Sequence, residues 1–130
     1  MSRTLLALIG LVLGTGSLAA QPPDLSGRWS GHWVSATNGH TGPLHARFRQ
    51  VDCDTYRVAF RGRFAKLLPF WYTTKLDVVG MGDGVVLLSA SQRLPLLGTY
   101  STTATATASD FDATFTSRKD SGRFIMSRRR

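Results

Sequence analysis

The stretch PLHARFRQVDCDTYRVAFRGRF, residues 43–64, decides the fold class of this chain. Apolar and polar side chains alternate on both sides of Asp52-Cys53-Asp54, a pattern typical of two half-buried strands joined by a turn. One face of this predicted hairpin is rich in arginine, whereas the other is apolar. The apolar face comprises Leu44, Ala46, Phe48, Tyr56, Val58 and Phe60. Because a sheet with one buried and one solvated face is antiparallel, the stretch predicts an antiparallel β-structure.

The same period of two continues through most of the chain beyond Pro23, with Gly, Asp, Asn and Pro at the breaks. The predicted strands span Gly27–Ser35, Pro43–Val51, Thr55–Phe64, Phe70–Val79, Val85–Ser91, Leu96–Thr105, Asp110–Ser117 and Arg123–Arg128. Eight short strands with short connections predict an all-β fold, an eight-stranded antiparallel up-and-down barrel whose closure removes exposed edges. A chain of this length holds one such domain, from residue 21 to 130.

The first twenty residues have the pattern of a secretory signal peptide. Arg3 precedes an apolar run from Leu5 to Leu13, and the small residues Ser17-Leu18-Ala19-Ala20 form a cleavage site. We therefore expect a secreted or periplasmic protein that begins near Gln21. The alternative is an uncleaved anchor, although the apolar run is short for a membrane span. No later stretch is long and apolar enough to cross a membrane as a helix.

The segment LSGRWSG, residues 25–31, resembles the start of the calycin barrels, the lipocalins and avidins. Those proteins open with a Gly-x-Trp strand and continue as an eight-stranded meander. The resemblance implies that Trp29 closes one end of the barrel against a basic residue late in the chain, either Arg123 or Arg128. The lipocalin Thr-Asp-Tyr motif and the helix after the barrel are absent. Avidin's late tryptophans are also missing, so biotin binding is not implied.

The interior of an eight-stranded barrel is either filled by its own side chains or holds one small ligand. Bulky rings would narrow this lumen, whereas small residues would widen it, namely Gly31, Ala46, Gly62, Gly98 and Ala113. The sequence therefore leaves open whether the lumen is filled by side chains or holds a ligand. The leading expectation is a non-enzymatic barrel that binds a small apolar ligand. Its expected lining is Tyr56, Phe60, Tyr72, Tyr100 and Gln50. Alternation places Trp71 on the outside.

The chain is basic, with sixteen Lys and Arg against eight acidic residues and a formal net charge of +8. Basic side chains gather on the outward faces of two strands that are neighbours in a meander. The arginines expected to form one patch are Arg47, Arg49, Arg57, Arg61 and Arg63. An anionic polymer is the alternative partner, because a patch of like charge is relieved by an anion. The other interpretation is a solvated face without a partner.

Other chemistry has little support in the sequence. His32, His40 and His45 lie close together in the chain and zinc accepts imidazole ligands, but neighbouring arginines disfavour a cation. We therefore predict no metal and no cofactor.

No catalytic motif is present and Glu is absent, so an enzyme at the barrel mouth ranks third among the functions. Cys53 forms no internal disulfide, and its two flanking aspartates predict a raised thiol pKa.

Overall fold

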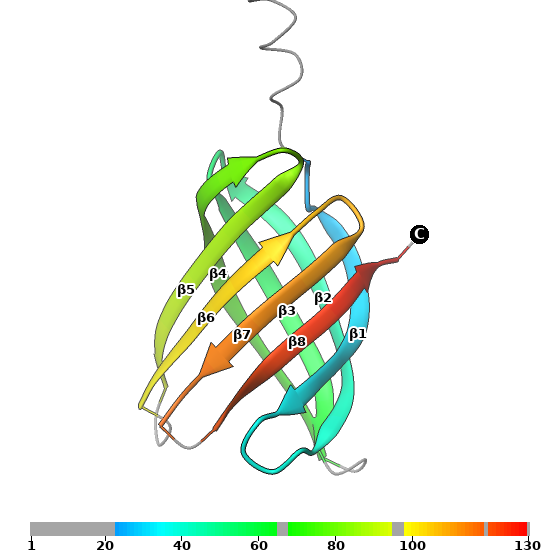
Figure 1. Ribbon diagram of the computed structural model, residues 1–130, viewed down its shortest axis with the longest axis vertical. Coiled ribbons are helices and arrows are strands. Elements are labelled where there is room, and N and C mark those ends of the chain that lie inside the picture. Colours follow the sequence, from blue (N-terminus) through cyan, green and yellow to red (C-terminus); the bar gives the residue numbers. More distant parts are fainter. Residues whose placement is uncertain (1–22, 65–67, 95–97, 119, 130) are drawn as a thin grey trace, which may run out of the picture.

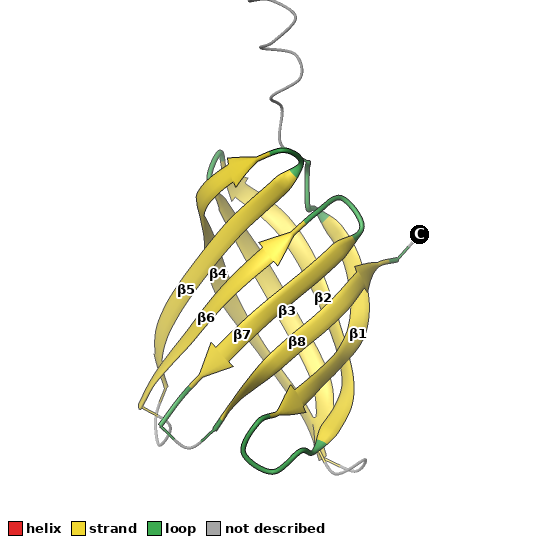
Figure 2. Ribbon diagram, viewed as in Figure 1, coloured by secondary structure: helices red, strands yellow, loops and turns green. Residues whose placement is uncertain are grey.

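Eight antiparallel strands close into a barrel in the order in which they follow along the chain (Figure 1). The computed structural model describes residues 23–64, 68–94, 98–118 and 120–129, so the predicted leader lies outside the described residues. The strands are β1 (Gly27–Ser35), β2 (Thr41–Asp52), β3 (Thr55–Phe64), β4 (Leu68–Gly82), β5 (Val85–Leu94), β6 (Gly98–Ala106), β7 (Asp110–Thr116) and β8 (Ser121–Arg128). Where the connections are described, they are turns and short loops (Figure 2). The described residues contain no helix long and apolar enough to span a membrane.

The predicted all-β meander is confirmed, and β1 and β3 have the predicted bounds. Several other strands are longer than the alternation indicated. β4 runs to Gly82 rather than Val79 because the ladder continues past an irregularity between Val78 and Gly80. β2 begins at Thr41 and β8 at Ser121, since backbone pairing extends into residues that have no apolar side chain. Residues 96 and 97, assigned to a strand from the sequence, lie outside the described residues.

Two glycines permit the closure of the barrel between β1 and β8. Gly31 is the register partner of Met126, and a Cβ on Gly31 would lie 1.8 Å from the Ile125 carbonyl oxygen. A Cβ on Gly122 would lie 2.0 Å from the carbonyl oxygen of Val34. The space that Gly31 leaves is therefore occupied by the backbone of β8. Glycine at these positions brings the first and last strands together and does not widen the lumen.

The segment before β1 caps one end of the barrel, which we call the capped end. Leu25 is fully buried there, and its carbonyl accepts a hydrogen bond of 2.9 Å from the indole N–H of Trp29. The guanidinium of Arg128 lies 4.8 Å from the Trp29 ring centroid and donates to the carbonyls of Asp24 and Ser26. Of the two basic partners implied for Trp29, Arg128 is therefore the one in place. Arg123 instead pairs with Asp112.

The last residues of β1, β3, β5 and β7 and the first residues of β2, β4, β6 and β8 lie at the opposite end, which we call the far end (Figure 1). Towards this end the barrel wall is split between β4 and β5. Their ladder runs from the pair Gly82–Val85 to the pair Asp77–Ser89. Beyond it, residues 68–76 pair with β3 and residues 90–94 pair with β6, but no described pair joins these two segments. Among the described residues, residues 72–76 of β4 and 90–94 of β5 therefore each have one edge without a strand partner.

Candidate functional site

Aromatic side chains occupy much of the lumen. Near the capped end, the ring centroids of Trp29 and Phe48 lie 5.6 Å apart. Further along, the Phe60 ring stacks on Tyr72 at 5.2 Å, and the rings of Phe115 and Phe124 lie 4.9 Å apart. Such contact distances leave no room for a ligand between these rings. In this part of the barrel, the protein's own side chains fill the lumen, which is one of the two alternatives that the sequence left open.

The five residues expected to line one pocket are distributed along the barrel. Tyr56 is buried at the capped end, where its hydroxyl accepts the Leu25 N–H at 3.1 Å. Gln50 is exposed there, and its amide donates to the Cys53 carbonyl. These two share a shallow hollow of about 120 Å³. The other three lie further along the barrel and contact one another in turn, Phe60 with Tyr72 at 5.2 Å and Tyr72 with Tyr100 at 6.0 Å. The structure therefore brings these three together and places Tyr56 and Gln50 beside the β2–β3 turn.

Tyr72 and Tyr100 form a polar contact inside the wall. Their hydroxyl oxygens are 3.3 Å apart, and their ring centroids are 6.0 Å apart. Burial raises the pKa of both phenols, that of Tyr100 to about 12. Both side chains therefore remain neutral at physiological pH and can donate or accept a hydrogen bond. Each is only partly buried, unlike Phe60 and Tyr56.

The outward face of β1–β4 carries a groove between its side chains, which we call the arginine groove. It consists of two hollows of about 410 and 560 Å³. Arg28, Arg47 and Arg129 line the first hollow, with Ala59 as a small residue between them, and Arg63 lines the second. His45, Arg61 and Trp71 line both. These three are successive register partners across β2, β3 and β4, so the two hollows form one continuous groove.

The groove is positively charged without an internal counter-charge. Among the described residues, the ion pair that forms joins Arg123 to Asp112, on β8 and β7, and no acid lines either hollow. Burial and the nearby guanidiniums of Arg61, Arg129 and Arg63 lower the pKa of His45. Its buried Nδ1 atom has no hydrogen-bond partner. The groove therefore presents cations to solvent and disfavours any further positive charge.

The five arginines predicted to form a patch all lie on this side of the barrel, but they do not all line the groove. Arg47, Arg61 and Arg63 line it. Arg49 and Arg57 are register partners beside it, and Arg57 also borders the split between β4 and β5. The sequence analysis missed Arg28 and Arg129. Arg28 follows from alternation with Trp29, whereas Arg129 joins the groove only because its N–H bonds to the Arg28 carbonyl at the closing seam.

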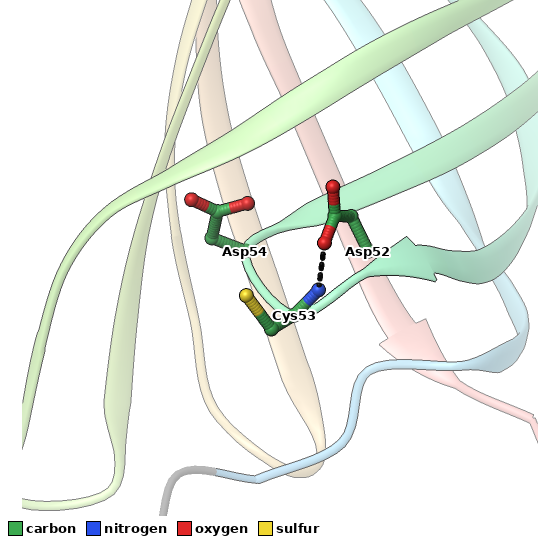
Figure 3. Close-up of side chains that lie close together, drawn as sticks. All are labelled: Asp52, Cys53 and Asp54. Atoms are coloured by element: carbon green, nitrogen blue, oxygen red, sulfur yellow. Dashed lines mark hydrogen bonds between the residues drawn. The ribbon is translucent and has the colours of Figure 1, made fainter.

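His32 and His45 lie on the neighbouring strands β1 and β2 but are not register partners. His32 lies opposite Pro43, and His45 lies between Ser30 and Arg61. At the β2–β3 turn, side-chain ligand atoms of Asp52, Cys53 and Asp54 lie within 4.8 Å of one another in an exposed position (Figure 3). Asp52 accepts the Cys53 N–H at 2.8 Å, and both aspartates raise the pKa of the thiol, as predicted. This arrangement is that of a solvated turn.

No family model and no curated protein matches this chain. Among solved structures, a redesigned β-barrel, mFAP1, bound to DFHBI, is similar to it with a TM-score of 0.59. The two sequences are 18% identical, and the match covers 81% of this chain and 94% of that chain. At this identity the similarity extends to the fold alone. The protein is an eight-stranded antiparallel β-barrel, similar in fold to a redesigned barrel that was solved with a small molecule bound.

Proposed function

We propose that this protein is an exported, non-enzymatic barrel that binds an anionic polymer along the arginine groove. The observation that carries the proposal is a groove lined by Arg28, Arg47, Arg61, Arg63 and Arg129, with no acid lining it. Cations held this close repel one another, and an anionic partner relieves that repulsion. Guanidinium groups also match carboxylate, sulfate and phosphate geometry, because each can donate two parallel hydrogen bonds.

The shape of the groove favours a polymer over a single small anion. Its lining comes from four neighbouring strands and the end of the chain, and strands lie about 4.8 Å apart, so it spans roughly 14 Å. Trp71 is 76% exposed beside Arg61 and offers a flat apolar surface. A sugar ring or a base can pack on such an indole while its charged groups contact the arginines.

A small ligand in the barrel is the second candidate. The fold is similar to that of a redesigned barrel bound to DFHBI, and the partly buried Tyr72 and Tyr100 leave polar and aromatic surface towards the far end. The contacting rings nearer the capped end argue against a ligand at the centre of the lumen. No observation favours the enzyme alternative, and we propose no reaction.

Retention on a heparin column across a salt gradient tests the arginine groove. The test variant combines Arg47→Ser, Arg61→Ser and Arg63→Ser, three arginines that line the groove. The matched control combines Arg93→Ser, Arg118→Ser and Arg123→Ser, which removes the same charge at residues outside the groove. We expect the test variant to elute at clearly lower salt than the control. Each arginine–anion contact that is lost reduces the number of counterions released on heparin binding by about one, and the affinity falls accordingly. Equal elution of the two variants would show that only net charge matters.

A second measurement locates the polymer without changing any charge. Ala59 is exposed between Arg47 and Thr73, so Ala59→Trp fills the first hollow and should weaken heparin retention. In nuclear magnetic resonance titrations, bound heparin should raise the pKa of His45, since an anion offsets the neighbouring guanidiniums. A pKa of His45 that does not move on binding would place the polymer elsewhere.

A further inference from the structure

We propose that the split between β4 and β5 is a second, separate binding site, and that it takes a small aromatic acid. Along the split lies a hollow of about 380 Å³ that is open to solvent, which we call the cavity. Ligand pockets commonly enclose about 300–1,000 Å³, so this volume suits a small molecule. Thr73 lines both this cavity and the arginine groove, so the two hollows are neighbours on β4. Thr74 from β4 and Ala90 and Gln92 from β5 line the cavity and not the groove, so the inner part of the site is separate from the groove.

Hydrogen-bonding groups line both sides of this cavity. Because the ladder ends at Asp77 and Ser89, the facing backbone edges of residues 72–76 and 90–94 have no strand partner among the described residues. Unpaired backbone N–H and C=O groups in a barrel wall are unfavourable unless water or a ligand pairs with them. Thr74 and Gln92 are partly buried beside these edges, and neither side chain bonds to another described residue. A ligand with polar groups on its edge would satisfy them.

The inner wall beside the cavity is aromatic and uncharged. Tyr72 shares the inward face of β4 with Thr74, and Tyr100 is the register partner of Gln92. The hydroxyl contact of 3.3 Å between the two tyrosines links β4 to β6 across the inside of β5. Two neutral phenol rings favour a flat aromatic body over a charged one. Neither tyrosine lines the cavity itself, so the part of the ligand that reaches them passes between Thr74 and Gln92 and is its flat aromatic body.

The outer rim supplies positive charge. Arg57 and Lys75 are register partners on β3 and β4, both line the cavity, and neither forms an ion pair with a described residue. Asp77 also lines the rim, where its carboxylate accepts a hydrogen bond of 3.2 Å from the Thr55 hydroxyl, and the two basic residues outnumber this one acid. An acidic group on the ligand would therefore lie beside Arg57 and Lys75. This arrangement selects an aromatic acid over a neutral aromatic molecule.

Two fluorescent dyes test the proposal: the aromatic sulfonate 1-anilinonaphthalene-8-sulfonate and the neutral N-phenyl-1-naphthylamine. We expect the sulfonate to bind the wild-type protein with one saturable site. Ala90→Trp fills the cavity and should weaken binding of the sulfonate at least tenfold, whereas Ala59→Trp fills the arginine groove and should leave it unchanged. The double variant Arg57→Ser, Lys75→Ser should weaken the sulfonate several-fold and the neutral dye much less.

Folding and alternative occupants are controlled in the same experiment. Heparin retention and thermal unfolding of Ala90→Trp should stay close to wild type, and Ala90→Leu provides a smaller change if tryptophan prevents folding. In the wild type, the sulfonate should slow amide hydrogen exchange in residues 70–76 and 90–94. Absent sulfonate binding, equal effects of Ala90→Trp and Ala59→Trp, or unchanged exchange in both segments overturns the proposal. Dimerisation that Ala90→Trp abolishes would also overturn it, because a strand of a second copy would then fill the split.

Discussion

Trp29 holds together several parts of the chain that are far apart in sequence. Its fully buried ring contacts Phe48 at 5.6 Å and Phe111 at 6.3 Å, and its N–H fixes the carbonyl of Leu25. Arg128 covers the outer side of the ring and bonds to the same lead-in segment. One side chain therefore joins the lead-in, β2, β7 and β8 at the capped end.

Replacement of this ring tests its structural role. Trp29→Ala should lower the free energy of unfolding by about 3–5 kcal/mol, because it leaves a large cavity and an unpaired carbonyl. Trp71→Ala is the matched control: its ring is 76% exposed, so we expect a change within about 0.5 kcal/mol. Urea denaturation of both variants measures the difference. Similar stabilities for the two variants would contradict the assignment of Trp29 as the closure of the capped end.

At the scale of the strands, the pair β1–β8 determines whether the sheet is a barrel. Gly31→Ala would place a Cβ 1.8 Å from a backbone oxygen of β8, which forces the two strands apart. We expect a loss of about 1–3 kcal/mol or more, together with faster amide exchange in β1 and β8. Gly82→Ala is the control, since nothing lies within 4 Å of a Cβ there. Equal stability of the two variants in urea would show that the closure tolerates a side chain.

Two neighbouring regions of the wall suggest different functions because their pairing differs. The ladders of β1–β4 are nearly continuous, so outward side chains form regular rows such as His45, Arg61 and Trp71. The ladder of β4–β5 stops at Asp77, and a cavity opens where it ends. Continuous pairing arranges charges into a patch, whereas interrupted pairing exposes backbone groups. The two proposed sites follow from this contrast.

At the scale of the whole molecule, the signal-peptide pattern and the structure of the capped end together predict where the exported chain begins. A cleavage near Ala20 or Gln21 retains Asp24, Leu25 and Ser26, which the capped end requires. Intact-mass analysis of the exported protein should therefore find an N-terminus near Ala20 or Gln21. A mass that still includes Met1 to Ser17 would contradict the signal-peptide prediction. A chain shortened beyond Leu25 should unfold at lower temperature, since Trp29 then loses its hydrogen-bond acceptor.

The sequence by itself determined the strands, their order and the side of the wall on which most side chains lie. Alternation with a period of two assigns Phe48, Tyr56 and Phe60 to the interior and Arg47 and Arg61 to the surface. Short turns make consecutive strands neighbours, so the arginines of β2 and β3 were correctly expected on one face. These features are local, because each depends on residues close together in the chain.

The tertiary structure alone decided which side chains meet along the barrel axis and across the closing seam. Tyr56 and Tyr72 face the same interior but belong to opposite ends, because the stagger of tilted strands determines depth and no local pattern encodes it. Arg128 reaches Trp29, and Arg129 reaches Arg28, only once β1 and β8 have closed. The end of the β4–β5 ladder likewise depends on the curvature of the whole barrel, so the proposed second site has no signature in the sequence.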